Sequence, residues 1–163
     1  MNAASLRRAL AYGLALSALF TVGCGPGFAM NLPDRFADLT RDPDVHDQRY
    51  GLRATTPDGV VLGVQRLDHH VDGSLTFWSE AVTRRLRDQQ GYALLGEEDI
   101  TAASGQTGHL MRFGRDLEGH AYRYTIALYV TPSHILLVEA GGREEAFQAL
   151  ETDIETSIRG MRM

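Results

Sequence analysis

The sequence predicts a single α+β domain in which helices pack on an antiparallel β-sheet. Three observations support this fold class. Several short segments alternate apolar and polar side chains, as strands do. The connections between successive strands are short, which favours antiparallel pairing. Two further segments, at residues 75–90 and 143–161, repeat apolar side chains at helical spacing. One sheet with helices packed on it accounts for this order of elements.

The first half of the domain is predicted to form a hairpin followed by a helix. Residues 50–56 and 59–67 are expected to be strands, because the "TPDG" between them has strong turn chemistry. Residues 75–90 are expected to be a helix that Ser74 caps and Gly91 ends. The apolar side of this helix consists of Leu75, Trp78, Val82 and Leu86.

The second half is predicted to contain four strands and a closing helix. The strands are expected at 92–100, 107–115, 120–131 and 134–140, and the helix at 143–161, after two glycines. In the third of these strands, one face is predicted to carry Tyr122, Tyr124, Ile126, Leu128 and Val130. The expected core comprises Trp78, Val82, Leu86, Tyr124, Ile126, Leu128, Phe147, Leu150 and Ile154.

The N-terminal residues are typical of an export signal. Arg7 and Arg8 form a basic start, and the apolar run at 9–22 is shorter than the roughly 20 residues that span a bilayer. We therefore predict a signal peptide at residues 1–23, a tether at 24–34 and the folded domain at 35–163.

The cysteine at the end of this signal indicates a lipid anchor. "LFTVGC" resembles the lipobox of bacterial lipoproteins, with cleavage between Gly23 and Cys24. The resemblance implies that diacylglycerol is attached to the Cys24 thiol and that the new amino terminus is acylated. It also implies that Gly25, where Asp would retain the protein at the inner membrane, favours the outer membrane. The alternative is an ordinary signal peptide that contains a cysteine by chance. Acylation would also consume a free thiol in an oxidising compartment.

The charge of the mature chain narrows the class of partner. Of 16 basic residues, Arg7 and Arg8 lie in the signal, so the mature chain keeps 14 against 21 acidic residues and has a net charge of about −7. Nucleic acids and anionic lipids both attract basic surfaces, so neither is the expected partner. Membrane attachment is therefore expected to come from the lipid, and the partner to be a protein of the envelope.

The domain resembles the PsbP-like superfamily, which includes the DcrB-like lipoproteins. The resemblance lies in "GLRATTPDGVVLGVQRL", "GYALLGEEDITAASGQTGHLMRF", "AYRYTIALYVTPSHILLVEAGG" and the closing "IETSIRGM". It covers about residues 28–161 and implies a small exported domain that is not an enzyme and has no shared catalytic residue or cofactor. Such domains act as assembly factors, chaperone-like binders or accessory subunits.

A metal-binding function is the alternative. "LDHHVDG" places Asp68, His69, His70 and Asp72 close together in the sequence. Imidazole and carboxylate groups are good ligands for zinc and other divalent metals. The competing interpretation is a solvated polar turn before the helix. In an extended chain, the two histidines would point to opposite faces.

Three further motifs have a structural explanation. "PSH" at 132–134 invites a Ser–His nucleophile, but sequence neighbours in a strand are not expected to face each other, and no nucleophile elbow is present. "GEEDI" at 96–100 is expected to be a solvated strand end, and "RRLR" at 84–87 a solvated helix face. The favoured function is thus a lipid-anchored binding module that uses an exposed sheet edge or the groove beside the first helix.

Overall fold

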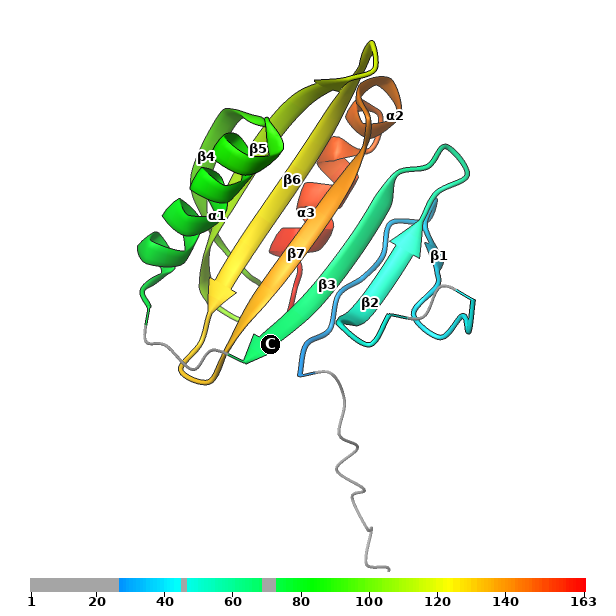
Figure 1. The fold of residues 1–163 in the computed structure, drawn as a ribbon. Coiled ribbons are helices and arrows are strands. Elements are labelled where there is room, and N and C mark those ends of the chain that lie inside the picture. Colours follow the sequence, from blue (N-terminus) through cyan, green and yellow to red (C-terminus); the bar gives the residue numbers. More distant parts are fainter. Residues whose placement is uncertain (1–26, 45–46, 69–72) are drawn as a thin grey trace, which may run out of the picture.

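The computed structural model describes residues 27–44, 47–68 and 73–163. Seven strands form one antiparallel sheet in the order β1-β2-β3-β7-β6-β5-β4. Helix α1 lies on one face of the sheet, and α2 and α3 lie on the other (Figure 1). The predicted α+β fold is confirmed. The elements are β1 (Ala37–Asp38), β2 (Tyr50–Thr55), β3 (Val61–Asp68), α1 (Leu75–Gln90), β4 (Ala93–Thr101), β5 (Thr107–Leu117), β6 (His120–Val130), β7 (His134–Arg143), α2 (Glu144–Gln148) and α3 (Glu151–Arg159).

The path of the chain places β4 at one edge of the sheet. β2 and β3 form the predicted hairpin, and β3 then pairs with β7 in the middle of the sheet. From the end of β3, the chain passes through α1 to β4, and three successive hairpins bring it back through β5 and β6 to β7. α1 therefore lies over the half of the sheet that contains β4, β5 and β6.

Both faces of the central strands are buried. Beneath α3, the buried set includes Tyr129, Leu136, Phe147, Leu150, Ile154 and Ile158. Beneath α1, it includes Leu86, Met111, Phe113, Ile126 and Leu128. The expected core is confirmed for Leu86, Ile126, Leu128, Phe147, Leu150 and Ile154. Trp78, Val82 and Tyr124 are only partly buried. α1 covers β4, β5 and β6 and leaves the β2–β3 side of this face open (Figure 1).

Two predicted boundaries are wrong near the end of the chain. The predicted helix at 143–161 is broken into α2 and α3, since Leu150 leaves the helical conformation with φ −122° while its side chain stays buried. β7 continues through Gly141 and Gly142 instead of ending at residue 140. Both glycines are packed closely, because a Cβ on Gly141 would lie 2.9 Å from the Tyr124 ring and one on Gly142 would lie 3.0 Å from Val60.

The described part of the predicted tether contacts the domain. Ala29 and Arg162 form a two-residue bridge, with N–H to carbonyl distances of 2.7 and 3.0 Å. The side chains of Phe28, Met30 and Leu32 pack against the core beneath α3. The N-terminal segment therefore runs along the domain from residue 28 onward.

Candidate functional site

Helix α1 is fixed at both ends and along one side. The Ser74 hydroxyl accepts a hydrogen bond from the Phe77 amide at 3.1 Å, which satisfies one free N–H of the first turn. Gly91 ends the helix with φ 70°, a left-handed conformation that glycine adopts at low cost. The predicted apolar side packs on the sheet. The polar side of α1 therefore stands beside the edge strand β4.

An open groove of about 760 Å³ lies between α1 and the edge of the sheet. We call it the α1 groove. Its helix wall is formed by Leu75, Thr76, Ser79, Glu80, Thr83, Arg84, Arg87 and Asp88, and its sheet wall by Leu94, Glu97, Asp99, Thr107 and His109. Two arginines of "RRLR", predicted to be a solvated face, thus line a concave surface. The Ser79 hydroxyl is buried there and has no hydrogen-bond partner among the described residues.

His109 lies at the centre of the sheet wall, between two carboxylates. It pairs directly with Asp99 across β4 and β5, and its Nδ1 lies 2.8 Å from an Asp99 oxygen. Its Nε2 lies 3.4 Å from a Glu97 oxygen. A neutral imidazole has one N–H and can donate to only one of them. The side chain of His109 is 19% exposed and that of Asp99 is 78% exposed, so the ring is held in place while the acids face solvent.

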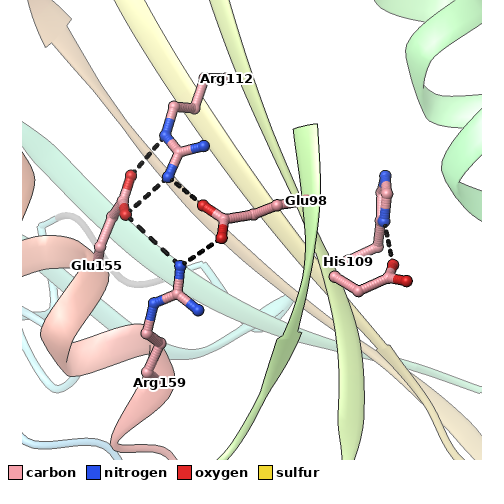
Figure 2. Close-up of polar contacts among 6 residues, drawn as sticks. Glu98, His109, Arg112, Glu155 and Arg159 are labelled. Carbon is pink, nitrogen blue, oxygen red and sulfur yellow. Dashed lines mark hydrogen bonds and ion pairs between the residues drawn. The ribbon is translucent and has the colours of Figure 1, made fainter. Parts of the chain in front are cut away.

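The remaining acid of "GEEDI", Glu98, points to the face of the sheet that carries α3. Glu98 accepts a hydrogen bond from Arg112 at 2.6 Å and lies 3.1 Å from Arg159. Arg112 also donates to Glu155 of α3 at 2.6 and 2.8 Å, so the four side chains form a closed ring of ion pairs (Figure 2). Hydrogen bonds from the two arginines lower the pKa of Glu98, and the bond to Glu155 raises the pKa of Arg112. The acidic run is therefore divided between the two faces of the sheet, and of its three acids only Glu97 and Asp99 line the α1 groove.

A second polar cluster lies on the open half of the α1 face. The hydroxyls of Tyr50 and Tyr124 both donate to the carboxylate of Glu139, and Gln65 Nε2 donates to it at 3.1 Å. A hollow of about 350 Å³ beside them is also lined by Tyr92. Burial, together with the hydrogen bond to Glu139, raises the pKa of Tyr50 to about 12, and burial raises that of Tyr124 as well. Glu139 is thus a carboxylate whose direct partners here are neutral donors.

The "PSH" motif differs from its expectation. Ser133 Oγ lies 2.9 Å from Nδ1 of His134, so these neighbours do face each other. Ser133 belongs to the turn before β7, where the alternation of a strand does not apply. The turn itself is closed by Thr131, whose hydroxyl donates to the His134 carbonyl at 2.8 Å. The contact therefore belongs to a β-turn that links β6 and β7.

The residues singled out in the sequence lie mostly outside the described part. Cys24, His69, His70 and Asp72 are outside it. Asp68 ends β3 with an exposed side chain, 3.9 Å from Arg66. Within the described ranges, no group of three or more His, Cys, Asp or Glu side chains is placed to hold a metal ion. The metal hypothesis for this cluster and the lipid anchor at Cys24 stay predictions.

The position of His109 beside Asp99 has a signal in the sequence. Asp99 and His109 are placed symmetrically about the "TAASGQT" turn of a predicted hairpin, so antiparallel pairing puts them opposite each other. The ring around Arg112 had no such signal, because Glu155 comes from a distant helix.

Among the described residues, no helix is both long and apolar enough to cross a membrane.

Comparison with known proteins identifies the fold. No protein-family model and no curated protein sequence matches the chain. Among solved structures, LpqN of Mycobacterium tuberculosis, described as involved in cell envelope biogenesis, has a TM-score of 0.65 at 15% identity, covering 86% of this chain and 88% of LpqN. Cyanobacterial PsbP (CyanoP) of Synechocystis sp. PCC 6803 has a TM-score of 0.62 at 12% identity, covering 84% of this chain and 86% of CyanoP. The Ran-binding protein Mog1p of Saccharomyces cerevisiae has a TM-score of 0.61 at 11% identity, covering 85% of this chain and 91% of Mog1p.

These likenesses show a shared fold. The chain has the PsbP-like fold, as its resemblance in sequence implied. The solved proteins with this fold named above include one that binds another protein and one that is linked to the cell envelope.

Proposed function

We propose that this chain is a non-enzymatic binding module of the cell envelope, anchored to a membrane by lipid at Cys24 and facing the periplasm. The anchor is supported by the lipobox-like "LFTVGC", and Gly25 after the cysteine favours the outer membrane. The envelope location is supported by the shared fold with LpqN, whose description names cell envelope biogenesis.

The α1 groove is the observation that carries the binding role. Its walls are formed by α1 on one side and by β4 and β5 on the other, and it borders the edge of the sheet. Concave surfaces with a few convergent polar groups are the usual places where a protein binds a ligand. Both surfaces expected to hold a partner, the exposed sheet edge and the groove beside the first helix, meet at this one place.

Mass spectrometry of the protein purified from membranes tests the anchor. The wild-type chain should begin at Cys24 and carry the added mass of a diacylglyceryl group and an acyl chain. The Cys24→Ala variant should lack this mass and should not be cut before residue 24. A soluble wild-type chain with a free thiol would overturn the anchor.

Site-specific photo-crosslinking in cells tests the binding role. A photoreactive residue at Thr76, exposed on the groove wall, should give a discrete adduct with an envelope protein. The same residue at Glu145, exposed on α2 on the other side of the sheet, is the matched control and should give none. Equal labelling from both positions, or no adduct from Thr76, would contradict the proposal.

A further inference from the structure

The two edges of the sheet differ in a way that points to a partner strand. One edge is β1, which has only two residues. The other is β4, which has nine residues and, within the described residues, pairs only with β5. An edge strand directs half of its backbone N–H and C=O groups outward, where they can pair with another extended chain. β4 is therefore the one long edge that the described chain offers.

Hollows lie on both faces of β4. On one face is the α1 groove, and on the other is a hollow of about 620 Å³ lined by Leu95, Gly96 and Arg112 of the sheet together with part of α3. Side chains of an extended strand point alternately to the two faces of its sheet. A strand added to β4 would therefore place every second side chain in the α1 groove and the others in the hollow beside α3. A helix would use only one of the two.

The two faces of the sheet at β4 differ in charge, and this difference indicates which side chains a partner strand would carry. The α1 groove is lined by four acidic side chains, Glu80, Asp88, Glu97 and Asp99, against two arginines, Arg84 and Arg87. The hollow on the α3 face is lined by the ring around Arg112, whose charges pair with one another, by one further carboxylate, Glu151, and by Leu95, which is 50% exposed. The hydroxyl of buried Ser79, which has no partner within the part of the chain that the structure describes, adds a hydrogen-bonding group to the groove wall. Basic side chains fit the first face, where acids outnumber arginines by two, and uncharged side chains fit the part of the second face beside Leu95.

The same charges argue against a second copy of this chain as the occupant. Two antiparallel β4 strands would bring the acids at positions 97–99 of both copies together. Like charges opposite each other destabilise a strand pair. The edge therefore disfavours self-pairing.

We propose that β4 binds an extended segment of a partner protein in which arginine or lysine alternates with uncharged residues, as an eighth strand of the sheet. The proposal rests on the binding role above and names the partner's chemistry. Backbone hydrogen bonds to β4 supply the attachment, and the alternate basic side chains in the α1 groove supply the selectivity.

Peptide binding to the full protein in detergent tests this proposal, with fluorescence anisotropy as the readout. The probe is a ten-residue peptide of alternating arginine and threonine. Two controls carry the same ten residues: one groups all arginines in a block, and one is N-methylated on every backbone amide nitrogen. The alternating peptide should bind at least tenfold more tightly than either control. Equal binding of the block peptide would overturn strand addition and leave only charge attraction, and undiminished binding of the N-methylated peptide would overturn it as well.

Matched variants test the groove. Glu97→Gln with Asp99→Asn should weaken binding of the alternating peptide at least tenfold, and since both side chains are largely exposed, the fold should be preserved. Glu145→Gln with Asp153→Asn removes the same charge from exposed positions of α2 and α3 and should leave binding unchanged. Equal loss in both double variants would overturn the assignment to the groove. A crosslink from Thr76 without binding of the alternating peptide would retain the binding module and reject strand addition.

Discussion

Replacing Tyr129 by phenylalanine tests how α3 is held on the sheet. The Tyr129 ring is fully buried and packs over Gly108, where a Cβ would come within 2.5 Å of it. Its hydroxyl donates to the carbonyl of Ile158 in α3 at 3.0 Å. Tyr129→Phe keeps the ring and removes this one bond. A hydrogen bond of this kind contributes about 1 kcal/mol, which corresponds to a fall in Tm of roughly 2–4 °C for a chain of this size.

The pH dependence of this variant makes the prediction sharper. Burial raises the pKa of Tyr129 to about 12, above the value of about 10 for an unfolded tyrosine. Between these values the unfolded chain ionises while the folded chain keeps its proton, so wild-type stability falls as pH rises. The loss attributable to this group is about 1.4 kcal/mol by pH 11. The sequence contains no lysine, so lysine titration does not obscure this range.

Urea unfolding followed by circular dichroism, at pH 7.5 and in steps from pH 9 to pH 11, measures both effects. Tyr129→Phe should be about 1 kcal/mol less stable at pH 7.5, and the two stability curves should meet near pH 11. Tyr122→Phe, on the same strand with a partly exposed side chain, is the control and should follow the wild type. Parallel curves for wild type and Tyr129→Phe from pH 9 to pH 11 would refute the reasoning.

Three further substitutions have definite expectations. Gly91→Ala should lower the free energy of unfolding by about 1 kcal/mol, because φ is 70° at the end of α1; a urea titration measures it. Arg112→Ala should cost about 2 kcal/mol in the same assay, because it leaves the partly buried Glu155 without its two charged hydrogen bonds. The double variant His69→Ala/His70→Ala should keep the wild-type Tm and peptide affinity, and calorimetric titration with Zn²⁺ should give the same result with and without the histidines.

Gly91→Ala and Arg112→Ala each have a control in the same chain. Gly96→Ala places a Cβ in open space and should cost less than Gly91→Ala. Arg85→Ala removes an exposed charge from α1 and should cost less than Arg112→Ala. If the control substitutions lower the free energy of unfolding as much as the test substitutions do, the left-handed conformation of Gly91 and the ion pairs of Arg112 do not explain the losses. Zinc binding that disappears with the two histidines would favour the metal hypothesis instead.

Local patterns predicted most of the fold. The "TPDG" turn, the Ser74 cap, the Gly91 end and the alternation of β6 depend on neighbouring residues, and the structure confirms each of them. The break between α2 and α3 was missed because "REEAFQALETDIETSIRG" keeps its helical spacing through Leu150. Two glycines in a row predict a strand end at Gly141 and Gly142, but both lie within β7, where the packing of Tyr124 and Val60 leaves room only for small residues.

The candidate site could be predicted only in outline. The groove beside the first helix and the sheet edge were expected, because an amphipathic helix on an open sheet leaves both. Which side chains face each other there depends on contacts that are distant in the sequence. Tyr50 and Glu139 are 89 residues apart, and Arg112 and Glu155 are 43 apart. Neither pair has a local pattern that would reveal it.

The bridge between Ala29 and Arg162 has a consequence for where the domain can work. Since Phe28 already packs on the core, only residues 24–27 separate a lipid on Cys24 from the folded body. Four residues reach at most about 14 Å even when fully extended. A domain anchored in this way would lie close to the lipid headgroups and could move only a short distance away from them. The search of such an anchored domain for a membrane-bound partner would be a two-dimensional one, confined to a layer little thicker than the domain itself.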